Sequence, residues 1–113
     1  NYNTKNIFID NIKKSKNFDK IIFFHMKSDN FFLKNKNTFD LIYIDGCHEE
    51  KFIVNDIINS FKFINKNGII WIDDYMGNTS NGKMKIYIDK ILEKYKNKFI
   101  VIHKGYQIAL HII

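Results

Sequence analysis

Two apolar runs that end abruptly in aspartate constrain the fold of this chain most strongly. FDLIYID, from Phe39 to Asp45, and GIIWIDD, from Gly68 to Asp74, each predict a buried strand, because apolar β-forming residues follow one another without polar alternation. The segment that begins at Glu49 and leads to Gly68 has apolar residues at helical spacing, acids in its first turn and lysines near its end, which is typical of an amphipathic helix. A strand, a helix and a strand in this order predict two parallel strands of an α/β sheet.

The rest of the chain continues this pattern. Residues 1–20 predict a helix, Ile21–Ser28 predicts another buried strand, and Lys83–Lys98 predicts a further amphipathic helix. The tail, Phe99–Ile113, predicts two strands about a turn at His103–Gly105.

The length allows one domain, and the order of elements gives its class. A chain of 113 residues suffices for a single core. We therefore expect one domain, residues 1–113, with a Rossmann-like, mostly parallel sheet, helices on both faces and a C-terminal antiparallel hairpin.

The amino-acid composition limits which binding partners and which cellular compartment can be expected for this chain. All eighteen basic residues are lysine, spread along the chain, and the formal net charge is +6. A phosphate-binding surface would more often cluster its charge and include arginine, so we expect solvated lysines and no nucleic-acid partner. No apolar run approaches the roughly 20 residues of a membrane span, and Cys47, a single cysteine, cannot form an internal disulfide. These features favour a cytoplasmic protein without a membrane partner.

The acids at the strand ends are the candidate site. The carboxyl ends of parallel strands meet at one edge of a sheet, which would bring Asp45, Asp73 and Asp74 together. Such carboxylates repel one another unless a cation neutralises them, and Mg²⁺ prefers oxygen ligands. His48, three residues after Asp45, could act as a general base beside the ion. Acids at strand ends also cap helices or face solvent, and a histidine here could simply lie on the surface.

These motifs resemble a known family. The region from Phe39 to Gly77 resembles the second half of a class I S-adenosylmethionine-dependent methyltransferase, and more narrowly the metal-dependent O-methyltransferases of the macrocin O-methyltransferase and cephalosporin-hydroxylase type. Asn67 stands where that family usually has glycine, and asparagine also reaches positive φ. The resemblance is carried by IDGCH at Ile44–His48, NGIIWIDDY at Asn67–Tyr75 and KGYQIAL at Lys104–Leu110.

The resemblance implies roles for these residues. It implies S-adenosylmethionine and Mg²⁺ as cofactors and a hydroxyl of a sugar or another small molecule as methyl acceptor. Asp45, Asp73 and Asp74 would be the magnesium ligands. His48 would be the catalytic base, with Asp45 also counted as catalytic.

Cofactor contacts are only partly represented in the sequence. The resemblance places Ser28 and Asp29 beside the adenine ring and counts Asp45 among the cofactor-binding residues. The glycine-rich loop and the ribose-binding acid of the class have no counterpart in these residues. We therefore expect a C-terminal portion of such a domain, with the first strands missing, that binds cofactor weakly alone and is completed by an N-terminal half or by homo-oligomerisation.

Two other interpretations remain open. A receiver-like signalling module also places acids at strand ends, but its acidic pair precedes the lone aspartate, which is the reverse of the order here. A non-catalytic methyltransferase-like remnant that acts as a binding module is the stronger alternative, since an exposed sheet edge favours association.

Overall fold

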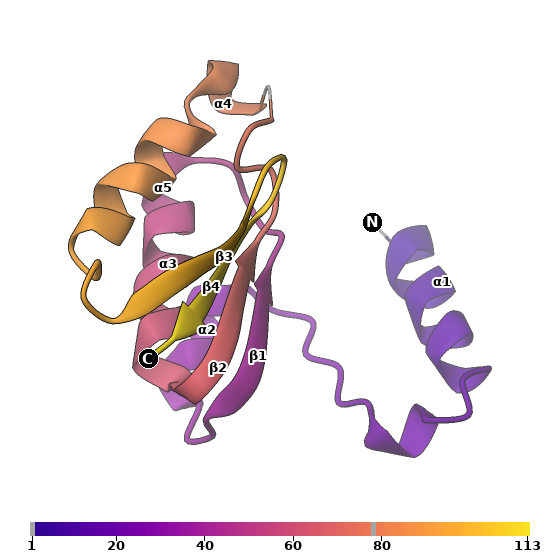
Figure 1. Cartoon of the computed structure of the whole chain (residues 1–113). Helices are drawn as coiled ribbons and strands as arrows, with labels where there is room; N and C mark the ends of the chain where they lie inside the picture. Colours follow the sequence, from indigo (N-terminus) through magenta and orange to yellow (C-terminus); the bar gives the residue numbers. More distant parts are fainter. Residues whose placement is uncertain (1, 78) are drawn as a thin grey trace.

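A computed structural model describes residues 2–77 and 79–113, and its body is a four-stranded sheet (Figure 1). The strands lie in the order β1-β2-β4-β3. β1 and β2 are parallel, whereas β4 is antiparallel to both β2 and β3. This arrangement confirms the α/β class and the C-terminal hairpin, but the described sheet is not mostly parallel as predicted, because β4 joins it antiparallel to both of its neighbours. The strands are β1 Phe39–Ile44, β2 Ile64–Ile72, β3 Phe99–Lys104 and β4 Ile108–Ile112.

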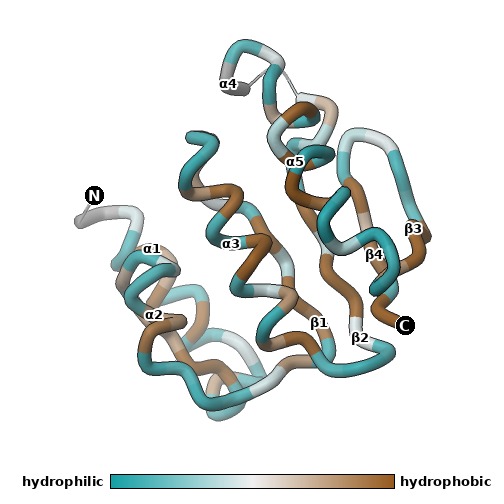
Figure 2. The backbone as a smooth tube through the Cα atoms, turned by 90° about the vertical axis from the view of Figure 1, so that its left-hand side faces the viewer, coloured by the Kyte–Doolittle hydropathy of each residue, from teal (hydrophilic) through white to brown (hydrophobic). Residues whose placement is uncertain are grey.

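Two helices, α3 and α5, cover one face of the sheet (Figure 1). In Figure 2, hydrophobic and hydrophilic residues alternate along both helices, as expected where one side of a helix is buried. Ile57 of α3 and Ile88 of α5 are completely buried against the sheet residues Ile70 and Leu110. The helices are α1 Tyr2–Lys13, α2 Ser28–Lys34, α3 Glu50–Phe63, α4 Thr79–Gly82 and α5 Met84–Glu93, and a 3₁₀ turn occupies Phe18–Lys20.

The opposite face of the sheet is open in the described part of the chain. Leu41 and Tyr43 of β1 are 60% and 52% exposed, so β1 is buried on one face only. α1 lies apart from the sheet in Figure 1. Helices therefore cover one face of this sheet rather than both, because no described helix packs over these side chains.

The prediction of a buried strand at Ile21–Ser28 is wrong. Residues 21–27 form neither helix nor strand, and every residue from 21 to 28 is exposed. A strand needs a hydrogen-bonded neighbour, and this run pairs with none of the described strands: β1, at the edge of the sheet, pairs only with β2, and its outer edge stays unpaired. β-propensity alone did not produce a strand here.

The boundary between α3 and β2 differs from the prediction by several residues. The helix ends at Phe63, and β2 begins at Ile64 rather than at Gly68. Asn67 has a φ of 66°, as expected for asparagine in a glycine-like position. A Cβ atom on Gly68 would lie 2.8 Å from the carbonyl oxygen of Asn65, so only glycine fits this kinked part of the strand.

Candidate metal and cofactor site

The ends of β1 and β2 bring the predicted acids to one edge of the sheet. Ile44 and Ile72, the last residues of the two strands, are register partners. The backbone N–H of Asp73 donates to the carbonyl oxygen of Ile44 at 2.9 Å, which continues the pairing one residue beyond β2. Asp45 and Asp74 therefore follow directly after two paired strands, as the sequence predicted.

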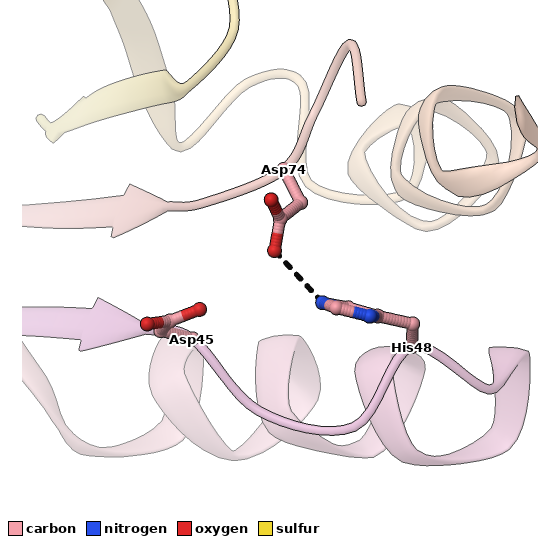
Figure 3. Close-up of side chains that lie close together, drawn as sticks. All are labelled: Asp45, His48 and Asp74. Atoms are coloured by element: carbon pink, nitrogen blue, oxygen red, sulfur yellow. Dashed lines mark hydrogen bonds and ion pairs between the residues drawn. The ribbon is translucent and has the colours of Figure 1, made fainter. Parts of the chain in front are cut away.

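Asp45, His48 and Asp74 form a cluster of possible metal ligands at this edge (Figure 3). One ligand atom from each residue lies within 4.8 Å of the others. His48 Nε2 lies 2.8 Å from Asp74 Oδ2, while the Asp45 carboxylate stands beside this pair in Figure 3. Two carboxylates and an imidazole at this spacing can surround one cation.

Asp73 is held differently from the other two aspartates. Its Oδ1 atom accepts hydrogen bonds from Gln107 Nε2 at 2.9 Å and from the backbone N–H of Asp74 at 2.8 Å. The bond from Gln107 is the main cause that lowers the pKa of Asp73. Asp73 is therefore an ionised carboxylate with one oxygen already engaged, and it lies outside the cluster of three.

The pKa of the Asp45 carboxyl group is raised above its ordinary value. Loss of solvent raises its pKa, and the neighbouring charges of Asp73 and Asp74 raise it further, whereas His48 lowers it. A raised carboxyl pKa means that a proton or another cation is favoured at this position.

Tyr106 contacts Asp74 and Gln107 contacts Asp73, although the sequence alone predicted no role for these two residues. Tyr106 donates its hydroxyl hydrogen to Asp74 Oδ1 at 2.5 Å, and this bond is the main cause that raises the pKa of Tyr106. The available signal was the resemblance of KGYQIAL to a family motif, which marks the segment but not its contacts.

A cavity of about 560 Å³ adjoins the cluster along β1. Its size falls within the range of small-molecule sites. All three residues that were predicted to bind cofactor, Ser28, Asp29 and Asp45, line it. The structure thus places Asp45 in both the cavity wall and the acidic cluster.

Asp56 of α3 is a further residue of this cavity that the sequence analysis did not identify. It is 8% exposed and accepts a hydrogen bond from Ser28 Oγ at 2.5 Å through Oδ1. Burial raises its pKa, while the bond from Ser28 lowers it and the charge of Asp29 raises it. An acid within the apolar stripe of a helix was the available signal.

An α/β sheet with acids at the carboxyl ends of two parallel strands and a cavity beside them is compatible with a Rossmann-like domain, in which ligands bind beyond the carboxyl ends of the strands. Residues 4–75 match the family model described as "Methyltransferase domain", and the chain belongs to this family. An uncharacterized protein of Acanthamoeba polyphaga mimivirus is 32% identical over 56 residues, which are 50% of this chain and 25% of that protein. The chain thus matches about a quarter of its relative's length. Across the described residues, no helix is both long and apolar enough to cross a membrane.

Proposed function

We propose that this domain belongs to an S-adenosylmethionine-dependent, Mg²⁺-dependent O-methyltransferase that acts on a hydroxyl group of a sugar or another small molecule. The convergence of Asp45, His48 and Asp74 within 4.8 Å, at the rim of the cavity, carries the proposal. Membership of a methyltransferase domain family favours S-adenosylmethionine as the methyl donor.

The side chains at the strand ends suit a hard divalent cation. Mg²⁺ binds proteins through one or two carboxylates and keeps several waters, and Asp45 and Asp74 supply two carboxylates within the cluster. Asp73 would act as the third carboxylate through Oδ2, since its Oδ1 accepts two hydrogen bonds. When bound, the ion would hold the acceptor hydroxyl and lower its pKa.

His48 is the proposed general base. The Nε2 atom of the His48 imidazole lies 2.8 Å from Asp74 Oδ2, and the ring would accept the hydroxyl proton. Asp74 would keep the ring oriented and stabilise its charge after proton transfer, as a carboxylate does for a catalytic histidine. In the transfer, the sulfonium–methyl bond breaks, the oxygen–methyl bond forms, and the proton passes to His48, leaving S-adenosylhomocysteine.

The cavity would hold the methyl donor. Ser28 and Asp29, which begin α2, line it together with Asp45, which also belongs to the cluster. A donor in this cavity would present its methyl group toward an acceptor held at the acids, and such positioning lowers the barrier of a bimolecular transfer.

A methyl-transfer assay tests the proposal. Because weak cofactor binding is expected, the protein is incubated with a large excess of radiolabelled S-adenosylmethionine, with Mg²⁺ and with a panel of sugar and other small hydroxyl acceptors. We expect transfer to an acceptor oxygen that falls at least about 100-fold in Asp45→Asn and on removal of the metal. Asp40→Asn is the matched control, because Asp40 is an exposed acid on the same strand, bonded to Asn65 and outside the cluster. Transfer that persists without metal, or in Asp45→Asn, would contradict the metal-dependent mechanism.

One observation favours a second candidate, a non-catalytic binding module. The apolar run at residues 21–26 is exposed, and the outer edge of β1 has no partner among the described strands. Exposed edges of this kind favour pairing with another chain. This candidate predicts association without methyl transfer in the same assay.

A further inference from the structure

The turn of the β3–β4 hairpin, residues 105–107, lies beside Asp73 and Asp74, which are here called the acidic pair. Ile72 and Ile108 are register partners in the antiparallel pair of β2 and β4. Residues that follow Ile72 therefore oppose residues that precede Ile108, which places Asp73 and Asp74 opposite Gln107 and Tyr106. Two consecutive residues of the turn thus bond to two consecutive acids.

Tyr106 fixes which oxygen of Asp74 faces the cluster. Its hydroxyl donates to Oδ1, while His48 Nε2 lies against Oδ2. The backbone of Tyr106 is held beside the acids, because its carbonyl oxygen accepts the backbone N–H of Met76 at 3.2 Å, while the tyrosine as a whole is 58% exposed. Gly77 leaves room for the hydroxyl, since a Cβ atom there would lie 3.2 Å from the hydroxyl oxygen. Tyr106 therefore holds the Asp74 carboxylate in one rotation, with Oδ2 toward His48.

Gln107 performs the corresponding task for Asp73. Trp71 Nε1, which can only donate, gives a hydrogen bond to Gln107 Oε1 at 2.7 Å. This bond fixes the orientation of the amide, so Nε2 points to Asp73 Oδ1 at 2.9 Å and to the hydroxyl of Tyr43 at 3.2 Å. Gln107 thereby holds the Oδ1 atom of Asp73, which also accepts the backbone N–H of Asp74.

We infer that Tyr106 and Gln107 are positioning residues of the metal centre, each of which orients one carboxylate of the Asp73–Asp74 pair. The inference rests on the proposed function. Partners that bond to metal-ligating groups fix ligand orientation, and their loss typically weakens metal binding about 10- to 100-fold. The hairpin turn would thus belong to the metal site, although neither residue would touch the ion.

Equilibrium titration with Mn²⁺ alone tests the inference without requiring methyl transfer. We expect Tyr106→Phe to bind Mn²⁺ about 10-fold more weakly than the wild type, because the phenyl ring keeps the packing against Gly77 but loses the hydrogen bond. Tyr87→Phe, which removes a hydroxyl from α5 away from the site, should bind like the wild type. A merely structural role would leave Tyr106→Phe unchanged and affect only a variant without the ring, such as Tyr106→Leu.

Gln107→Met gives a second, independent variant, since methionine keeps the length of the side chain and donates nothing. We expect a loss of Mn²⁺ affinity of about 10-fold here as well. Unfolding midpoints for both variants check that the fold persists. If the wild type binds Mn²⁺ and both variants bind within about twofold of it, the positioning role is overturned and the metal centre stands. If the wild type does not bind Mn²⁺, the metal centre fails and the inference fails with it.

Discussion

The Nε2 atom of His48 lies 2.8 Å from the Oδ2 atom of Asp74, although the two residues are 26 positions apart. The parallel pairing of β1 and β2 produces this contact, because each residue follows one of the two strands. Asp74 has a φ of 61°, a conformation that non-glycine residues rarely adopt and that costs on the order of 1 kcal/mol. The hydrogen bond from its own N–H to Asp73 Oδ1 stabilises this turn. The strained backbone aims the Asp74 carboxylate at His48.

Asp74→Asn removes the negative charge of Asp74 and keeps the shape of the side chain nearly unchanged. Asparagine tolerates positive φ and has nearly the same volume, so we expect the unfolding midpoint to stay within a few degrees of the wild type. The loss of a carboxylate should weaken Mn²⁺ binding at least about 10-fold, which the same titration measures. Unchanged Mn²⁺ affinity in Asp74→Asn would exclude Asp74 as a ligand.

Asp56 should make stability depend on pH. Burial raises the pKa of Asp56, so the folded state holds the proton more tightly than the unfolded state does. The stability that this tighter proton binding gives to the folded state is fully present below the ordinary carboxyl pKa of 3.8. It is lost as the pH rises through the raised pKa of Asp56 in the folded state. Asp56→Asn removes this loss of stability with rising pH, because an amide does not ionise. Asparagine also keeps an oxygen that can accept the hydrogen bond from Ser28.

We therefore expect Asp56→Asn to be more stable than the wild type at pH 7, with a difference that narrows toward pH 3.8 and below. Urea unfolding at several pH values measures the difference, with Asp10→Asn on the exposed surface of α1 as control. A difference that is constant with pH would show that Asp56 titrates alike in both states.

Neighbouring isoleucines of α3 should differ sharply in their contribution to stability. Ile57 is 0% exposed and belongs to the core, whereas Ile58, the next residue, is 40% exposed. Ile57→Ala should lower the free energy of unfolding by about 2 to 5 kcal/mol, because it leaves a cavity between the helix and the sheet. Ile58→Ala should change it by less than about 1 kcal/mol. Equal losses in urea unfolding would contradict the observed orientation of α3.

Local signals were sufficient where an element is defined by its own residues. α3 and the existence of the β3–β4 hairpin were predictable, since helix periodicity and turn residues are read within a short window. The turn itself lies at residues 105–107 rather than at the predicted His103–Gly105, because β3 continues to Lys104. The proximity of Asp45 and Asp74 was predictable too, because parallel strands end at a common edge.

Contacts set by long-range packing could not be predicted in the same way. The bonds of Tyr106 and Gln107 to the acidic pair depend on which strand the hairpin joins, and nothing near those residues in sequence states it. The bond between Ser28 and Asp56 likewise depends on how α2 meets α3. Ile21–Ser28 has the composition of a strand, but whether it forms one depends on another strand with which its backbone can pair.

Ile22 provides a direct test of the corrected segment. Its side chain is 79% exposed, so Ile22→Lys should change the free energy of unfolding by no more than about 0.5 kcal/mol and should reduce self-association by interrupting an exposed apolar run. Ile70→Lys is the matched contrast, because Ile70 is 0% exposed and a lysine there would bury an unpaired charge and prevent folding. Urea unfolding and light scattering measure the two effects. A loss of several kcal/mol in Ile22→Lys would show that this run packs as a strand in solution, either against a further segment or against a second copy, and would restore the prediction that the structure of this chain overturns.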